Sequence, residues 1–205
     1  MAAGIAHHAA IDRLIESDVH LAAVVARAGR PEPFRRPPTF ATLVLLILEQ
    51  QVSLSSAAAA FRRLEETVRV EPESVLGLDD ETLHAVGFSR QKTRYVRALS
   101  EAVLVGDISL GVLGDLSDHA VRNSLVALPG VGPWTADVFL LSCLGRPDVW
   151  PVGDRALQVG TAEVLELGAV PSPDALEIIG ERWRPLRSTA AQLIWHDYLA
   201  RRGRV

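Results

Sequence analysis

Hydrophobic positions recur at helical spacing along most of the chain, and no stretch keeps the alternation typical of a β-strand. The longest apolar run, residues 43–48, lies inside a predicted helix over residues 40–52 that follows a Pro-Pro-Thr sequence, a usual start for a helix. Further helices, several with a Ser or Asp cap or a closing glycine, are predicted over residues 55–68, 81–86, 90–105, 118–128, 134–144, 154–167, 174–183 and 185–202. The chain is therefore expected to be all-α.

Composition narrows the class of protein. The chain is 48% hydrophobic and 22% charged, as in a folded globule, and no apolar run reaches the roughly 18 residues of a membrane span. Its single cysteine, Cys143, excludes an internal disulfide and any zinc or iron–sulfur site of four cysteines. The N-terminus lacks a basic start followed by a long apolar stretch, so we expect no secretion signal and a cytoplasmic location.

Charge is distributed unevenly along the chain. The net charge of −4 and the pI near 5.9 argue mildly against a nucleic-acid partner. However, residues 88–97 carry four basic side chains and no acid, and the chain from Arg182 onward carries six arginines against Asp197 alone. Residues 65–81 are strongly acidic. Each run is also compatible with nothing more than the solvated face of a helix.

The sequence LPGVGPWTA, residues 128–136, lies between two predicted helices. Gly130 and Gly132 can adopt positive φ and leave no Cβ in the way of an approaching group. Their amides and the N-terminus of the next helix can therefore point at one anion, and a DNA phosphate would fit without any base being read. The alternative is a plain corner between two helices.

Four segments together resemble one family. LPGVGPWTADVFLL (128–141) is similar to the helix-hairpin-helix of the HhH-GPD DNA glycosylase superfamily, and GRPDVWPVGD (145–154) to the Gly/Pro-rich loop that ends in its catalytic aspartate. LILEQQVS (46–53) and GFSRQKTRYV (87–96) resemble further segments of its DNA-3-methyladenine glycosylase II (AlkA-like) branch. The matches run in family order over nearly the whole chain.

The resemblance implies a two-lobed helical fold with the active-site cleft between the lobes. We expect one lobe to combine residues 1–36 with about 155–205, and the other to span 37–154 and carry the helix-hairpin-helix at about 117–145. The β-rich N-terminal domain of longer bacterial relatives is expected to be absent, as in compact members.

The family pattern assigns catalysis to Asp154. From the residue alone, Asp154 would be the N-cap of the next helix, and one carboxylate can serve both roles. Positive charge develops on the sugar as the bond from C1′ to the base lengthens, and a fixed carboxylate stabilises that charge or activates water. The scissile bond is hidden in a duplex, so the nucleotide must first rotate out.

The resemblance also implies residues that hold the flipped base and the DNA. The base pocket maps to Trp134, Val138 and Leu186, where Val138 and Leu186 stand in place of aromatic residues of some relatives, so we expect a less aromatic pocket. Trp183, Trp195 and Tyr198 are each as consistent with the core as with the pocket. DNA contacts map to Gln51, which would fill the gap left by the flipped base, and to Gly130, Val131, Gly132, Thr135 and Lys92. From the residue alone, Gln51 is also consistent with a buried polar group at the end of a helix.

Trp134 occupies the position where the lyase branch has its Schiff-base lysine, and Lys92 is the only lysine in the chain. We therefore expect a monofunctional enzyme without an iron–sulfur cluster or any required cofactor. Lys92 would meet phosphate or solvent. Family hairpins often hold a monovalent cation, Na⁺ or K⁺, on main-chain carbonyls, which here would be those of Val126, Leu128 and Val131.

The leading hypothesis is a monomeric, nucleoid-associated glycosylase that hydrolyses the N-glycosidic bond of alkylated purines in double-stranded DNA, with no membrane partner. Which lesion it prefers among 3-methyladenine, 7-methylguanine, hypoxanthine and ethenoadenine stays open. One alternative is a non-enzymatic helix-hairpin-helix protein that recognises damaged or branched DNA. Another is a helical interaction domain that does not bind DNA.

Overall fold

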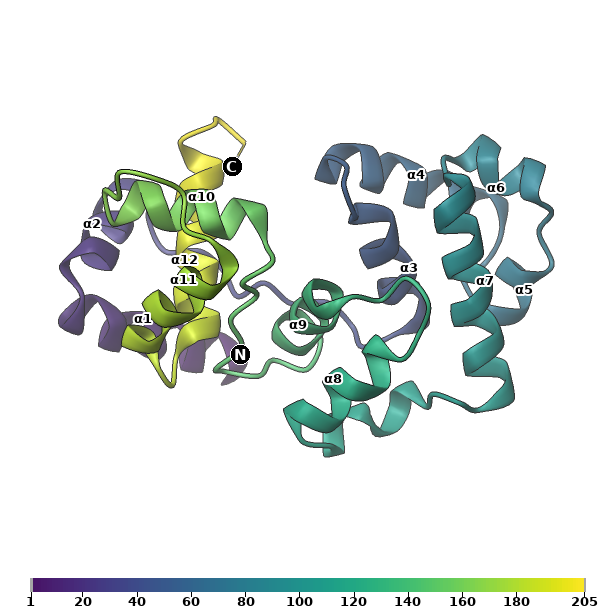
Figure 1. Ribbon diagram of the computed structural model, residues 1–205, viewed down its shortest axis with the longest axis horizontal. Helices are drawn as coiled ribbons and strands as arrows, with labels where there is room; N and C mark the ends of the chain where they lie inside the picture. Colours follow the sequence, from purple (N-terminus) through teal and green to yellow (C-terminus); the bar gives the residue numbers. More distant parts are fainter. Residues whose placement is uncertain (1, 205) are drawn as a thin grey trace. The chain divides into compact units, whose positions relative to one another are not determined.

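The computed structural model describes residues 2–204, and all regular structure in that range is helical, as predicted. The chain divides into two compact units, shown with their helices in Figure 1. The terminal unit combines residues 1–35 with 145–205, and the central unit spans residues 36–144. The cleft expected between the lobes stays a prediction.

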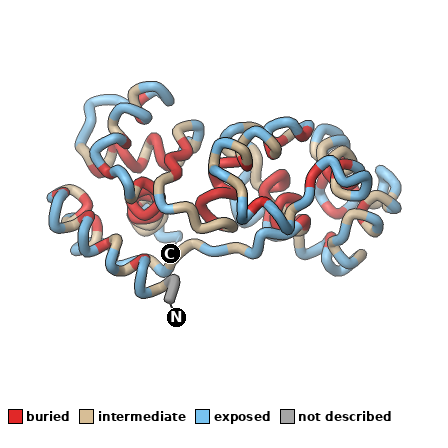
Figure 2. The backbone as a smooth tube through the Cα atoms, turned by 90° about the horizontal axis from the view of Figure 1, so that it is seen from below, coloured by how far each residue is buried: buried red, intermediate tan, exposed pale blue. Residues whose placement is uncertain are grey.

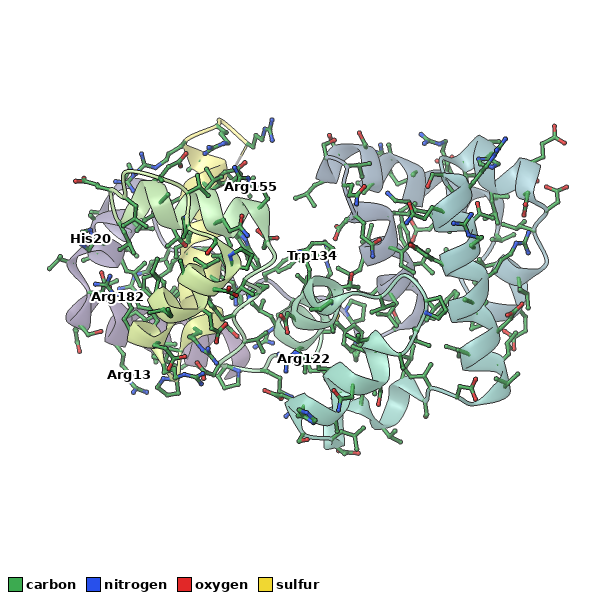
Figure 3. The ribbon with its side chains drawn as sticks, in the orientation of Figure 1. Arg13, His20, Arg122, Trp134, Arg155 and Arg182 are labelled. Atoms are coloured by element: carbon green, nitrogen blue, oxygen red, sulfur yellow. The ribbon has the colours of Figure 1, made fainter. Side chains whose placement is uncertain are left out.

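The terminal unit packs the two ends of the chain together. It contains α1 (Ala2–Ser17), α2 (Val19–Ala28), α10 (Arg155–Val164), α11 (Pro173–Gly180), the 3₁₀ turn η2 (Glu181–Trp183) and α12 (Arg187–Ala200). Helix α12 packs against α1, α2 and α10. Asp18 ties the ends, because it caps α2 and also accepts the indole N–H of Trp183 at 2.9 Å and the guanidinium of Arg182 at 3.2 Å. Arg182 is labelled in Figure 3.

The central unit contains α3 (Phe40–Glu49), α4 (Leu54–Thr67), α5 (Pro72–Leu76), α6 (Asp80–Val86), α7 (Arg90–Val105), η1 (Leu110–Asp115), α8 (Asp118–Val126) and α9 (Pro133–Ser142). Helix α3 packs against α4, α7 and α9. Its apolar run is buried, since Leu43, Leu46 and Ile47 are fully covered. Ala57 and Ala60 of α4 are also buried, as expected of small residues at close helix contacts.

Two boundaries differ from those predicted. The second boundary between units lies at residues 144 and 145 instead of about 154 and 155, because the loop before Asp154 packs on the terminal unit through Trp150 and Trp183, whose ring centroids are 5.2 Å apart. Helix α3 ends at Glu49 instead of continuing to residue 52. Its end coincides with extended backbone at Gln50 and a left-handed φ of 58° at Gln51.

Each unit has its own core, visible as the buried segments in Figure 2. Burying apolar side chains contributes about 25 cal/mol per Å², so these cores are the main source of stability. Within residues 2–204, no helix is both long and apolar enough to cross a membrane.

Candidate active site

Asp154 lies at the N-cap of α10, in the terminal unit. Its Oδ1 accepts the backbone N–H of Leu157 at 2.7 Å and the indole N–H of Trp195 at 3.0 Å. Two donors on one oxygen fix the orientation of the carboxylate, and the positive end of the α10 dipole favours its negative charge. The residue is half-buried. The cap to Leu157 and the bond to Trp195 both use Oδ1.

An aromatic pair adjoins this carboxylate. Trp195 is half-buried and meets the ring of Phe34 edge-on, with centroids 6.4 Å apart and an interplanar angle of 83°. Phe34 is held in turn, because its backbone N–H donates to Oε1 of Gln192 at 2.7 Å. Trp183, by contrast, is only 1% exposed and belongs to the core. The guanidinium of Arg202 covers the ring of Tyr198 at 3.6 Å. Of these aromatics, Trp195 is the one bonded to Asp154.

The loop that carries Asp154 is fixed on both sides. The indole N–H of Trp150 donates to the carbonyl of Leu176 at 2.8 Å, and a Cβ at Gly180 would lie 2.5 Å from that nitrogen. The N–H of Val149 donates to Oγ of Ser188 at 2.9 Å. These contacts attach the loop to α11 and α12. They therefore restrict the position of Asp154, and a carboxylate held in this way needs little reorganisation during a reaction.

Arg187 makes the strongest of these attachments. Its side chain is 9% exposed, and its Nε donates to Oδ1 of Asp148 at 2.9 Å while Nη2 donates to the Asp148 carbonyl at 2.9 Å. Nη1 also reaches Glu177 at 3.1 Å. A nearly buried guanidinium must be paired and hydrogen-bonded in this way, so the loop and α12 are held as one piece.

The hairpin lies in the central unit, between α8 and α9. The N–H of Val131 donates to the carbonyl of Leu128 at 3.1 Å, with Pro129 and Gly130 between them, and Gly130 has φ 83°. Proline followed by a left-handed glycine is the sequence of a type II turn. Gly132 then caps α9, and Pro133 is its first residue, so the first turn of the helix presents backbone N–H groups toward an incoming anion.

The two hairpin glycines have different surroundings. A Cβ at Gly130 would lie 2.1 Å from Cγ of Tyr95, so the tyrosine ring lies directly against the glycine. A Cβ at Gly132 would meet nothing within 4 Å, and φ there is −89°. Gly130 is therefore required for packing, whereas Gly132 faces the open space that a phosphate would need.

The ion pair of Arg122 with Asp137 joins the two hairpin helices. Nη2 of Arg122 lies 2.6 Å from Oδ1 of Asp137, and Figure 3 labels Arg122 on α8. Asp137 is 8% exposed, whereas the side chain of Arg122 is 37% exposed, so only the acidic end of the pair is shielded from water. It fixes the angle between α8 and α9 that the turn requires.

The side chains of two residues expected to contact DNA are buried. The side chain of Val131 is 3% exposed, and its N–H is already used in the turn. Thr135 is 1% exposed, and its Oγ1 accepts Nε2 of Gln50 at 3.1 Å. DNA contact by Val131 and Thr135 stays a prediction, and it would have to use main-chain atoms.

Gln51 and Lys92 lie on the same unit as the hairpin. Gln51 is exposed on the turn after α3, and its entry into a duplex stays a prediction. Nζ of Lys92 donates to the carbonyl of Leu48 at 2.6 Å, and burial lowers the pKa of this ammonium. Lys92 therefore binds the C-terminal end of α3, and a phosphate contact stays a prediction.

The residues predicted for the base pocket fall in both units. Trp134 is half-buried in the first turn of α9, and Val138 lies one turn later on the same face, 4% exposed. Leu186 lines a groove of about 330 Å³ in the terminal unit, together with Arg13, Trp183 and Arg184; Asp154 is not among the described residues that line it. The place of Leu186 in a base pocket stays a prediction; in this groove its segment lies against α1.

The hairpin carbonyls have the chemistry of a site for a monovalent cation. Helix α8 ends at Val126, and the last carbonyls of a helix lack intrahelical N–H donors. The carbonyl of Leu128 accepts the N–H of Val131 and keeps a second lone pair. Neutral oxygens suit Na⁺ or K⁺, so the carbonyls of Val126, Leu128 and Val131 fit such an ion.

Three residues of this arrangement, Trp195, Gln50 and Arg187, cannot be assigned from the sequence. Of these, Gln50 has a local signal, since its amide side chain directly follows the end of a helix. The contacts of the other two depend on packing between distant segments.

A family model described as "HhH-GPD superfamily base excision DNA repair protein" matches residues 44–185, more than half of the chain. The chain belongs to the HhH-GPD superfamily. Among solved structures similar to this HhH-GPD chain is the Schizosaccharomyces pombe 3-methyladenine DNA glycosylase Mag1 in complex with abasic DNA, with a TM-score of 0.84, 26% identity, and coverage of 91% of this chain and 94% of that one. A DNA-3-methyladenine glycosidase from Bacillus halodurans aligns with a TM-score of 0.74 at 31% identity, over 91% of this chain and 87% of that one.

Curated relatives of this HhH-GPD chain include the putative DNA-3-methyladenine glycosylase YfjP of Bacillus subtilis, 28% identical over 74% of this chain. The alignment spans 56% of the length of YfjP, and 59% of the Schizosaccharomyces pombe alkylbase DNA glycosidase-like protein mag2. These relatives are thus matched over little more than half of their own length.

Proposed function

We propose that this chain is a monofunctional DNA glycosylase that removes alkylated purines of the 3-methyladenine type from double-stranded DNA by hydrolysis. The observation that carries the proposal is the Asp154 carboxylate, held by the Leu157 amide and the Trp195 indole in an HhH-GPD chain. The names of the similar glycosylases and the abasic DNA bound to one of them support the same substrate class.

Asp154 would act on the deoxyribose. As the N-glycosidic bond lengthens, positive charge develops at C1′, and a carboxylate that is already oriented stabilises it without reorganisation. The same group would orient or deprotonate the water that completes hydrolysis. An alkylated purine already carries positive charge and leaves readily, so no strong acid is needed at the base.

Binding would precede this step. The hairpin amides and the first turn of α9 would hold a phosphate, and Gln51 would fill the stack after the nucleotide rotates out, which costs a few kcal/mol and least at a damaged pair. Trp134 would offer an aromatic face to a cationic base, where a cation–π contact contributes about 1–2 kcal/mol. A monovalent cation on the carbonyls of Val126, Leu128 and Val131 would add positive charge beside the phosphate.

The proposal includes the absence of strand cleavage. Lyase chemistry needs an amine that forms a Schiff base with the sugar, and the position of that lysine in relatives is Trp134 here. The one lysine of the chain, Lys92, binds the end of α3. An abasic site should therefore be the final product.

The test is a screen of duplexes that each carry one lesion: 3-methyladenine, 7-methylguanine, hypoxanthine or ethenoadenine. Released bases are identified by mass spectrometry, and the DNA is analysed with and without alkali. The proposal predicts that free base is released without alkali, and that the strand breaks only after alkali is added. Salt-dependent DNA binding with no base released from any duplex would instead indicate a non-enzymatic DNA-binding protein.

A further inference from the structure

The turn after α3 is attached to the hairpin by one side chain. Gln50 follows the last residue of α3, and its Nε2 donates to the carbonyl of Gly130 at 2.8 Å and to Oγ1 of Thr135 at 3.1 Å. These partners lie 80 and 85 positions further along the chain, on either side of Gly132. One amide group therefore spans the glycine turn and the first turn of α9.

The contacts of Gln50 are partly buried. Thr135 is 1% exposed, whereas Gln50 and Gly130 are half-buried, and Gly130 is packed against Tyr95. The carbonyl of Gly130 is bonded by Gln50 while its Cα is packed against the tyrosine ring. Loss of the Gln50 donor would leave a partly buried carbonyl without this partner, so the bond favours one conformation of the turn.

The next residue is the one that would enter the duplex. Gln51 is exposed and has φ 58°, an uncommon conformation for a residue other than glycine. On the other side of the turn, Nζ of Lys92 binds the carbonyl of Leu48 at 2.6 Å. The segment that presents Gln51 is thus fixed to α7 before the turn and to the hairpin through Gln50.

We propose that Gln50 is a positioning residue for base extrusion: it couples the hairpin that holds the phosphate to the turn that inserts Gln51. This inference rests on the proposed function. Fixed geometry between two such groups matters because a displacement of about 1 Å can lower a rate by roughly a hundredfold. The side chain of Gln50 is bonded to the hairpin, so we expect its effect on extrusion and not on chemistry.

The test uses Gln50→Met, which keeps the length of the side chain and removes both donors. A lesion that the wild type excises is placed in a fully paired duplex or in an unpaired bubble, with 2-aminopurine beside it to report unstacking. We expect Gln50→Met to slow single-turnover release from the duplex by about tenfold or more, with weaker 2-aminopurine fluorescence, and to match the wild type on the bubble. Asp154→Asn should lose release from both.

Asn123→Ala is the matched control, because it removes an exposed amide from α8 whose side-chain contact is with His119. It should match the wild type on both substrates. If Gln50→Met does not fold, Gln50→Glu answers the same question, since it keeps the size but cannot donate to the Gly130 carbonyl.

Three outcomes would overturn the inference. The Gln50 variant could release base from the duplex at the wild-type rate, or it could lose equal activity on the duplex and the bubble. If the wild type releases base from neither substrate nor from any lesion, the proposed function fails, and the inference falls with it.

Discussion

Trp195 donates its indole N–H to Oδ1 of Asp154 at 3.0 Å, although the two residues are 41 positions apart. That oxygen also caps α10 through the N–H of Leu157. The carboxylate is therefore oriented both by its own helix and by α12. This arrangement gives a physical reason why an acid at a helix N-cap can also be a fixed electrostatic group for catalysis.

Trp195→Phe tests the contribution of the indole to that orientation. The phenyl ring keeps the aromatic contact with Phe34 but removes the donor to Asp154, so we expect a loss of about 1 kcal/mol of unfolding free energy and a larger effect on rate, about tenfold in single-turnover base release. Leu157 still caps α10 in this variant. An unchanged rate would show that the Trp195 bond does not help to position the carboxylate.

Arg187→Met should destabilise the loop that carries Asp154. The substitution leaves Asp148 without its nearly buried partner, and breaking such a pair costs about 3–5 kcal/mol. Arg184 also binds Asp148, at 2.9 Å, but its side chain is 47% exposed. Arg184→Met is therefore the matched control, with an expected cost below about 1 kcal/mol. Urea unfolding of both variants measures the difference, and equal costs would contradict the account of the loop.

Alanine at the two hairpin glycines should separate folding from DNA binding. Gly130→Ala forces a Cβ into the ring of Tyr95 at a left-handed φ, so we expect a lower melting temperature. Gly132→Ala meets no protein atom within 4 Å and should cost less than about 1 kcal/mol of unfolding free energy. Its methyl group lies where the phosphate would approach, so affinity for duplex DNA should fall. Thermal unfolding and fluorescence anisotropy check the two effects, and the reverse pattern would contradict the assignment.

Gln51→Gly tests whether the left-handed turn is kept for function. Glycine adopts φ near 58° without a steric penalty but loses the side chain, so the free energy of unfolding should change by less than about 1 kcal/mol. Base release from a paired duplex should nevertheless fall, because nothing fills the vacated stack. A variant as active as the wild type would remove Gln51 from the mechanism.

Much of the fold could be predicted from sequence because its determinants are local. The buried run of α3, the Ser and Asp caps and the hairpin Pro-Gly pattern each specify the backbone within a few residues. The sequence predicts that the first helix of the central unit ends at residue 52, three residues after the observed end of α3 at Glu49. Gln50 leaves the helix, and its side chain binds the carbonyl of Gly130, 80 positions further along the chain. The position of Leu186 against α1 and the burial of the Thr135 side chain could not be predicted for the same reason. Such contacts depend on which distant helices meet.

The most direct test of the central claim is the single-turnover rate of base release by wild type and by Asp154→Asn, on the duplex from which the wild type releases base fastest. Asparagine is nearly isosteric, caps a helix about as well as aspartate, and still accepts from Leu157 and Trp195 through its carbonyl oxygen, so the fold should be preserved. The account predicts a rate at least about a hundredfold lower with DNA affinity retained. Equal rates of release by the two proteins would contradict it.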